Sequence, residues 1–388
     1  MSYIWDLPTK VLFGPGQLGN LHEEAMPGKK ALLVISNGNS VKKNGSLERV
    51  KKELELAGAD FVIFDKIQAN PLEPTIMEGV EAARANGCDF LVGLGGGSVL
   101  DSTTIISAVA PQKEGRVWDY VSGGTGGGRT LEEEPLPYIE ITTSAGTGSE
   151  VDAWGVVTNP ETHEKIGFQG GYPSLAIVDP ELMVSVPPNY TAYQGFDALF
   201  HSVEGYVSKF ANEAADMFEL EAIRNIGEYL PRAVKDGSDL EARTKVAFAN
   251  TMSGYSMEVC SCMSEHAIEH ALSGYHQSLP HGAGLIMVSR AYFGRWIDEH
   301  ICDDRFVTMA KALGKADATA PEDFLEALES LMRACGVDDL KMSGYGITPD
   351  EFPVMAKDAR ETMGGLFLCD RFDIGVEDVV EIYKKSYK

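Results

Sequence analysis

The first half of the chain alternates short apolar runs with longer amphipathic stretches. Residues 45–59 and 74–87 repeat apolar positions at helical spacing and end in glycine or another small residue, which predicts helices between the apolar runs. Such alternation is typical of βα units around a parallel sheet. The runs that we predict to form strands are residues 31–36, 60–65, 90–95, 138–142 and 175–179.

Near residue 185 the pattern changes to long amphipathic segments with few strand-like runs. Residues 213–234 and 321–336 are examples, and both predict helices. A chain of 388 residues is also longer than a single hydrophobic core usually supports. We therefore predict two domains, an α/β domain with a parallel, Rossmann-like sheet over residues 1–185 and an all-helical domain over residues 186–388.

Net charge, the lengths of apolar runs and the cysteine content indicate which partners and which cellular location to expect. The formal net charge of −25 disfavours nucleic acid and anionic membranes, because a field of that sign repels phosphate. The chain lacks an uninterrupted apolar run of about eighteen residues, and its first ten residues lack the features of a secretory signal, so we expect a cytoplasmic protein. Six cysteines without a C-x-x-C pair suggest neither a disulfide framework nor a thiolate zinc site, and we interpret the close pair Cys260 and Cys262 as buried small residues.

The predicted strand at 90–95 is followed by a glycine turn and a helical pattern, "FLVGLGGGSVLDSTTIISAVA". Glycines allow a backbone to approach a ligand closely, and the first N–H groups of a helix favour an anion such as phosphate. The turn departs from the usual dinucleotide fingerprint because Ser98 stands where the last glycine belongs. A tight turn that binds nothing is the alternative. Ser98 and Asp101 also fit a capping pattern, a role that is compatible with cofactor contact.

A second polar loop, "TTSAGTGSEV", follows the predicted strand at 138–142. In a parallel sheet both loops would lie at the carboxyl ends of strands, which is where ligands bind. Its hydroxyl groups can bind ribose, pyrophosphate or an amide, although a purely structural loop would have the same composition.

Four of the eight histidines fall in "EHAIEHALSGYHQSLPHG", residues 265–282. His266 and His270 are four residues apart, as are Asp197 and His201 in "GFDALFHSVEGY", so each pair shares one face of a helix. A surface ion pair would explain Asp197 and His201 equally well. Taken together, the two segments predict a mixed N/O site for Zn²⁺ or Fe²⁺ rather than Mg²⁺ or Ca²⁺, but spacing does not say which side chains join His266 and His270.

These motifs resemble those of the iron-containing (group III) alcohol dehydrogenase family, and they occur in the family's order along nearly the whole chain. The matching segments are "PTKVLFGPG", "GLGGGSVLD", "TTSAGTGSE", "LAIVDPEL", "GFDALFHSVEGY", "EHAIEHALSGYHQSLPHGAGL" and "VEDVVEIYKKSY". The resemblance implies a nucleotide-binding α/β domain, a helical metal-binding domain and a metal between them. It also implies metal ligands at Asp197, His201, His266 and His281, and a place beside the nicotinamide for His270, as a proton relay or a positioning residue.

The resemblance further implies a set of cofactor-binding residues, namely Gly95, Gly96, Gly97, Ser98, Asp101, Thr142, Thr143, Thr147 and Lys165. Residues 36–45, "SNGNSVKKNG", lack the acidic residue that commonly binds the ribose 2′-hydroxyl of NAD. Gly38, Ser40, Lys42 and Lys43 can instead accommodate a 2′-phosphate, and the stretch is similar to the NADP(H)-using butanol dehydrogenase and aldehyde reductase branch, although that branch often has more glycine here. NADP(H) is therefore favoured over NAD(H).

We accordingly expect an enzyme that transfers a hydride between NADP(H) and a primary alcohol or aldehyde, with Fe²⁺ favoured and Zn²⁺ as the alternative metal. A dehydroquinate synthase-like or glycerol dehydrogenase-like enzyme of the same fold is a second reading, and a non-catalytic nucleotide- or metal-binding protein is a third. The resemblance implies at least a homodimer, with residues 1–14 at its interface.

Overall fold

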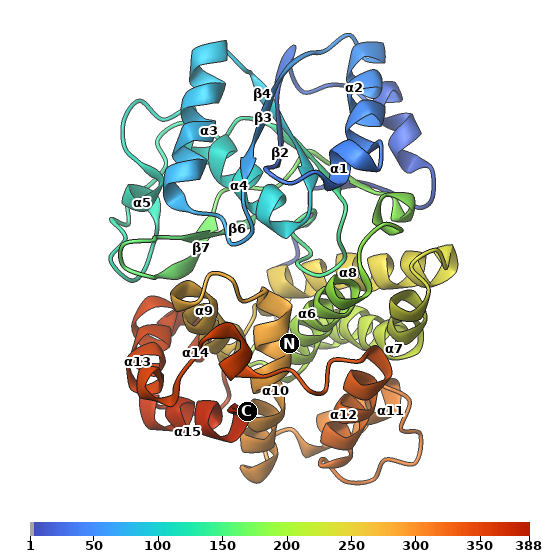
Figure 1. Ribbon diagram of the computed structural model, residues 1–388, viewed down its shortest axis with the longest axis vertical. Helices are drawn as coiled ribbons and strands as arrows, with labels where there is room; N and C mark the ends of the chain where they lie inside the picture. Colours follow the sequence, from blue (N-terminus) through green and yellow to red (C-terminus); the bar gives the residue numbers. More distant parts are fainter. Residues whose placement is uncertain (1–3) are drawn as a thin grey trace. The chain divides into compact units, whose positions relative to one another are not determined.

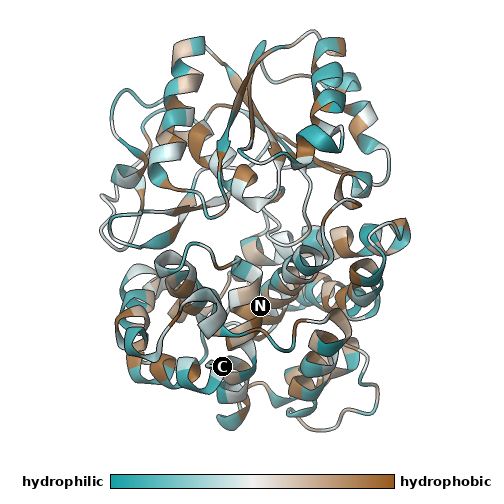
Figure 2. Ribbon diagram, in the orientation of Figure 1, coloured by the Kyte–Doolittle hydropathy of each residue, from teal (hydrophilic) through white to brown (hydrophobic). Residues whose placement is uncertain are grey.

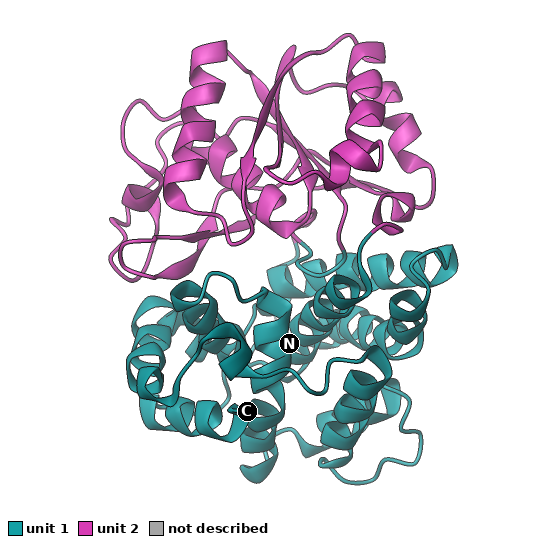
Figure 3. Ribbon diagram, viewed as in Figure 1, with its two compact units in different colours: residues 1–5, 145–148, 186–388 teal, residues 6–144, 149–185 magenta. Residues whose placement is uncertain are grey.

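The computed structural model describes residues 4–388, which form two compact units (Figure 3). The α/β unit comprises residues 6–144 and 149–185. The helical unit comprises residues 186–388 together with residues 145–148 and residues 4 and 5. The predicted fold class, a parallel-sheet α/β domain followed by a helical domain, is confirmed.

A six-stranded sheet forms the centre of the α/β unit, with the strand order β1-β8-β5-β4-β2-β3 and parallel pairing throughout. Five of these strands lie where the apolar runs predict them. Their bounds are β2 (Lys30–Ser36), β3 (Asp60–Ile67), β4 (Phe90–Gly95), β5 (Tyr138–Thr142) and β8 (Leu175–Val178). The sixth, β1 (Lys10–Phe13), pairs with β8, so part of the segment predicted to lie at a subunit interface is an edge strand of this sheet. The first three residues of that segment lie outside the described residues.

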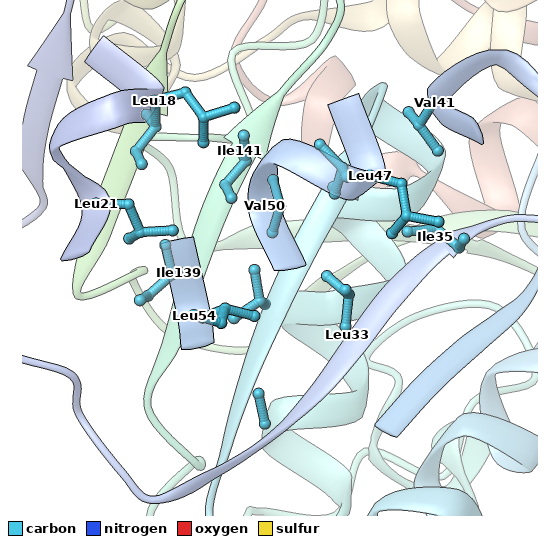
Figure 4. Close-up of a cluster of buried hydrophobic side chains, with 14 of the residues drawn as sticks. Leu18, Leu21, Leu33, Ile35, Val41, Leu47, Val50, Leu54, Ile139 and Ile141 are labelled. Atoms are coloured by element: carbon cyan, nitrogen blue, oxygen red, sulfur yellow. The ribbon is translucent and has the colours of Figure 1, made fainter. Parts of the chain in front are cut away.

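Helices cover the sheet because its inner strands are apolar on both faces (Figures 1 and 2). Leu33 and Ile35 of β2 share one face and belong to a buried cluster with Val50 and Leu54 of α2 (Figure 4). Because side chains on the opposite face of such a strand are buried as well, the strand is a continuous apolar run in the sequence. The other elements of this unit are η1 (Gln17–Glu23), α1 (Ser40–Lys43), α2 (Ser46–Leu56), α3 (Glu73–Asn86), α4 (Gly97–Val109), α5 (Val117–Tyr120) and η2 (Pro180–Met183).

The order in which the chain adds strands to the sheet reverses between β2 and β4. From β2 the chain crosses to β3 at the edge of the sheet, and it then returns to place β4 on the other side of β2. In open α/β sheets, ligands bind at the carboxyl ends of strands beside such a reversal. The glycine turn after β4 and the segment after β2 are therefore placed where a dinucleotide is expected.

Two features of this unit were not predicted. A separate antiparallel pair, β6 (Trp154–Thr158) with β7 (Lys165–Gln169), follows the second polar loop. Its strands are short and are joined by a polar turn that contains His163 with φ of 66°, so the apolar alternation is too brief to stand out. Helix α4 also begins within the glycine run, at Gly97, with Gly96 alone between it and the end of β4.

The helical unit contains the two helices predicted from the longest amphipathic patterns, now bounded as α7 (Glu213–Lys235) and α12 (Asp323–Cys335). Asn212 caps α7 by accepting hydrogen bonds from the backbone N–H groups of Ala214 and Ala215. The other helices are α6 (Pro188–Val207), α8 (Leu240–Cys260), α9 (Ser264–Tyr275), α10 (His281–Asp298), α11 (Asp303–Ala312), η3 (Met342–Tyr345), η4 (Pro349–Glu351), α13 (Phe352–Thr362), α14 (Gly364–Phe367) and α15 (Val376–Ser386). None of the helices within residues 4–388 has the length and apolar character needed to cross a bilayer.

Candidate metal centre

The structure brings together four side chains from three helices of the helical unit. Asp197 and His201 lie one turn apart on α6, His266 lies on α9, and His281 is the first residue of α10. The Nε2 atoms of His201, His266 and His281 lie 3.8, 3.6 and 3.5 Å from Oδ1 of Asp197. Gly282 permits this approach, because a Cβ at that position would overlap the carbonyl oxygen of Tyr193 on α6.

The distances and the unsatisfied polar atoms fit a bound cation. Ligand atoms at 2.0–2.2 Å from a tetrahedral Zn²⁺ or similar ion are roughly 3.3–3.6 Å from one another, close to the separations seen here. Oδ1 of Asp197 and Nε2 of His266 are buried and have no hydrogen-bond partner within the described chain. Because buried polar atoms are nearly always paired, two orphans facing each other indicate a missing positive ion.

The opposite nitrogen of each imidazole is held by a second group. Nδ1 of His266 contacts Oε2 of the buried Glu204 at 2.5 Å, and Nδ1 of His281 contacts Oε2 of the buried Glu269. Nδ1 of His201 lies 3.2 Å from the carbonyl oxygen of Gly146. A metal-bound histidine usually donates its other N–H to such an acceptor, which fixes the ring orientation and leaves Nε2 for the ion.

The side chains of this cluster shift one another's pKa values. Burial acts to raise the pKa of Asp197. The three neighbouring imidazoles, of His201, His266 and His281, outweigh this effect and hold that pKa well below its usual range. Burial lowers the pKa of His201 to about 3, so this imidazole is neutral. Burial opposes the charged form of His266 too, but Glu204 and Asp197 raise its pKa to about 10. A cation that binds here therefore replaces a proton on His266.

His270, the predicted relay or positioning residue, lies beside this cluster. Its side chain is buried one turn after His266 on α9, and its ring centroid is 5.2 Å from that of His281. The structure thus places His270 next to a predicted ligand, while its role stays a prediction.

Sequence reasoning missed Glu204 and Glu269. Both stand three residues after a predicted ligand, but neither contacts that ligand: Glu204 reaches His266, 62 residues away, and Glu269 reaches His281. The signal available in the sequence was an acidic residue one helical turn from a predicted ligand, and this signal does not name a partner.

Several of the predicted cofactor residues lie at or just after the carboxyl ends of β4 and β5 in the α/β unit. Gly95 and Thr142 end the neighbouring strands β4 and β5 and are paired in register. The backbone N–H of Thr143 donates to the carbonyl oxygen of Gly95 at 2.8 Å, so the two polar loops are joined. A Cβ at Gly95 would lie 2.5 Å from Cγ2 of Val99, which means that the turn needs glycine here for packing alone.

The remaining predicted cofactor residues belong to other elements. Gly38 and Ser40 follow β2, and Lys165 begins β7, where its Nζ donates to Oδ1 of Asn70 at 3.3 Å. Thr147 belongs to the short segment 145–148 of the helical unit, unlike the others.

Ser98 and Asp101 do not form the capping pair that their spacing suggests. The N-cap of α4 is Gly96, which has no side chain to cap the helix, and Oδ1 of Asp101 accepts a hydrogen bond from Oγ of Ser149 at 2.8 Å. The capping explanation is therefore wrong, because Asp101 faces the second polar loop rather than the end of its own helix. The first N–H groups of α4 are left without a side-chain cap, as at phosphate-binding turns.

A glycine turn at the switch point of a parallel sheet and an N₃O cluster in a helical unit are together typical of metal-dependent dehydrogenases. Comparison with known proteins bears this out. Residues 8–180 match the model of the iron-containing alcohol dehydrogenases, and residues 191–387 match the C-terminal model of the same family. The chain belongs to the iron-containing alcohol dehydrogenase family and is an oxidoreductase of that type.

Individual relatives cover nearly the whole chain. The NAD-dependent methanol dehydrogenase of Bacillus methanolicus is 33% identical over 385 residues, covering 92% of each chain. The NADH-dependent butanol dehydrogenase A of Clostridium acetobutylicum is 29% identical over 401 residues, covering both chains completely. The crystal structure of an archaeal halo-thermophilic alcohol dehydrogenase from a Red Sea brine pool superposes with a TM-score of 0.93 at 35% identity, covering 100% of this chain and 99% of that one. These matches favour the dehydrogenase over the lyase and the non-catalytic protein.

Proposed function

We propose that this protein reversibly transfers a hydride between NADP(H) and a primary alcohol or aldehyde, using a divalent ion held by Asp197, His201, His266 and His281. The proposal is carried by one observation: three imidazole Nε2 atoms lie 3.5–3.8 Å from a buried carboxylate oxygen, and each opposite Nδ1 is already engaged. Fe²⁺ is favoured over Zn²⁺ because of the family, and three nitrogens with one oxygen suit either ion.

The protein side chains divide the work at this centre. When bound, a divalent ion acts as a Lewis acid toward the oxygen of an alcohol or aldehyde. Asp197 contributes the one negative charge among the ligands, and each imidazole would bind the ion in its neutral form, for which His266 would give up a proton. His270 is placed beside His281, where it can position the nicotinamide or accept a proton from the alcohol through water or ribose.

The cofactor is assigned to the carboxyl edge of the sheet. Gly95, Gly96, Gly97 and Ser98 would bind the pyrophosphate at the start of α4, where uncapped N–H groups point outward from the helix. Asp101, Thr142, Thr143, Thr147 and Lys165 are proposed to complete the binding of the dinucleotide. The cytoplasmic location and the assembly into at least a dimer remain predictions from the sequence.

The preference for NADP(H) rests on the segment after β2. Residues 36–45 hold two lysines and no acidic residue, which suits a 2′-phosphate. Parallel pairing with β3 brings one carboxylate close, since Nζ of Lys42 lies 2.8 Å from Oδ2 of Asp65. Lys43 and the backbone at Gly38 and Ser40 are then the groups proposed to receive the phosphate. Two relatives are named for NAD or NADH, so this preference calls for a direct test.

Asn37→Asp is expected to reverse the cofactor preference. A carboxylate directly after β2 would accept a hydrogen bond from the ribose 2′-hydroxyl of NADH and repel a 2′-phosphate. One unfavourable charge pair near a protein surface is worth about 1–4 kcal/mol, so kcat/KM for NADPH relative to NADH should fall at least about fivefold. Steady-state kinetics with both cofactors measure this ratio. A wild-type protein that already prefers NADH tenfold would overturn the proposed NADP(H) preference.

Removing the metal tests the proposed reaction itself. Protein purified without oxygen and then treated with a chelator should lose the aldehyde-dependent oxidation of NADPH, for example with butanal as substrate. Fe²⁺ should restore the activity, whereas Mg²⁺ should not, because Mg²⁺ prefers an octahedral oxygen shell. Full activity after chelation would contradict the proposal. Turnover of a phosphorylated substrate without net oxidation of NADPH would favour the lyase instead.

A further inference from the structure

Cys262 lies beside two of the proposed metal ligands. It belongs to the short segment between α8 and α9, and its side chain is half-buried. One ligand atom each from Cys262, His201 and His266 lies within 4.8 Å of the other two. This group overlaps the cluster formed by Asp197, His266 and His281.

The neighbouring thiol points elsewhere. Sγ of Cys260 lies 3.7 Å from Nδ2 of Asn212 and 3.5 Å from the carbonyl oxygen of Phe210. The intervening Ser261 has φ of 64° and ψ of 162°, a backbone conformation that is rare outside glycine. This turn separates the two thiols, so that only Cys262 approaches the histidines.

The imidazoles of this second group have nitrogens to offer an ion. Glu204 holds Nδ1 of His266, and the carbonyl oxygen of Gly146 holds Nδ1 of His201, so Nε2 is the coordinating atom that remains on each ring. Nε2 of His266 is buried and has no hydrogen-bond partner within the described chain. An unpaired imidazole nitrogen near a thiol is an observation independent of the cysteine, and it points to a cation.

We propose that Cys262 is an additional metal ligand, which gives this centre a second, sulfur-containing ligand set that shares His201 and His266 with the first. This inference rests on the proposed metal centre. The thiol would bind as a thiolate, with its proton released to solvent. Thiolate and imidazole together suit Zn²⁺, whereas the Asp197 carboxylate is the harder ligand. Cys262 therefore increases the affinity of the centre for zinc relative to iron, whereas the Asp197 carboxylate favours iron.

X-ray absorption at the zinc edge tests the sulfur ligand directly. The probe is Zn²⁺ alone, loaded stoichiometrically into the full chain. Wild-type protein should show one sulfur neighbour at about 2.3 Å in addition to nitrogen and oxygen neighbours at about 2.0–2.2 Å. Cys262→Ser should lose the sulfur neighbour and keep the others. The matched control is Cys302→Ser, which removes a similarly half-buried thiol outside the group and should keep the sulfur neighbour.

Metal competition provides a second measurement. When Fe²⁺ and Zn²⁺ are supplied together without oxygen, Cys262→Ser should shift the ratio of bound iron to bound zinc several-fold toward iron, as determined by mass spectrometry. Circular dichroism checks that the variant is folded, and Cys262→Ala replaces it if the serine variant is not.

The outcomes separate the two proposals. Zinc bound by wild-type protein through nitrogen and oxygen alone would overturn the role of Cys262 and leave the metal centre intact. A sulfur neighbour that persists in Cys262→Ser would overturn it as well. Failure of the wild-type protein to bind zinc or iron stoichiometrically would instead overturn the metal centre and with it the proposed function.

Discussion

His266→Ala is expected to lose its bound metal and to reduce kcat/KM by at least about a thousandfold. Nε2 of His266 is buried, faces Oδ1 of Asp197 and has no hydrogen-bond partner within the described chain. The substitution removes one of three imidazole ligands, and alanine has no ligand atom to replace it. A metal acting as a Lewis acid contributes several kcal/mol to transition-state stabilisation, and about 4 kcal/mol corresponds to a thousandfold change in rate.

Metal content and activity are measured on the same anaerobic preparation. His276→Ala is the matched control, because that imidazole follows α9, contacts Glu351 at 3.0 Å and lies outside the ligand cluster. The control should retain about one ion per chain and its activity. A His266→Ala protein that binds iron stoichiometrically would show that the ion is held elsewhere.

Glu204→Gln is expected to weaken metal binding by about 10–100-fold, the usual effect of removing an outer partner of a metal-bound histidine. The glutamine keeps the size of the side chain and can still contact Nδ1 of His266, but it removes the negative charge that strengthens the imidazole as a ligand. Fe²⁺ affinity is measured by titration against a competing chelator. Because Glu269 holds His281 in the same way, Glu269→Gln should have an effect in the same direction.

Glu53→Gln is the matched control for this substitution. Glu53 contacts Nδ1 of His22 at 2.6 Å in the α/β unit. Its substitution therefore alters the same kind of carboxylate–imidazole contact, but not at a proposed metal ligand. Its metal affinity should equal that of the wild type. An unchanged affinity in Glu204→Gln, with the fold intact by circular dichroism, would show that Glu204 serves only the packing of α6 against α9.

The inner strands of the sheet could be predicted because burial on both faces turns them into nearly uninterrupted apolar runs, as in residues 31–36. The edge strand β1 is only partly buried and was not predicted. The histidine cluster was visible for a similar reason, since the spacing of His266 and His270 follows from one turn of a helix. Spacing alone could not add Asp197, His201 and His281. Those residues came from the resemblance, and the structure brings them together at 3.5–3.8 Å.

The remaining features depend on contacts between segments far apart in the chain. Glu204 and Cys262 acquire their meaning only when α6, α9 and the segment before α9 are packed together. The ion pair of Lys42 with Asp65 likewise arises from the pairing of β2 with β3, so a search for acidic residues along 36–45 could not find it. Local patterns predict elements, whereas such contacts depend on how the elements are arranged.

All four proposed ligands belong to α6, α9 and α10, and none belongs to the sheet. Any ion held there binds the folded form of the helical unit and not its unfolded chain, so iron supply and folding are thermodynamically linked in that unit. At a free ion concentration a hundred times the dissociation constant, the added stability is about 2.7 kcal/mol. Loss of the ion would remove this part of the stability of the helical unit, so proteolysis of that unit should become faster when iron is scarce.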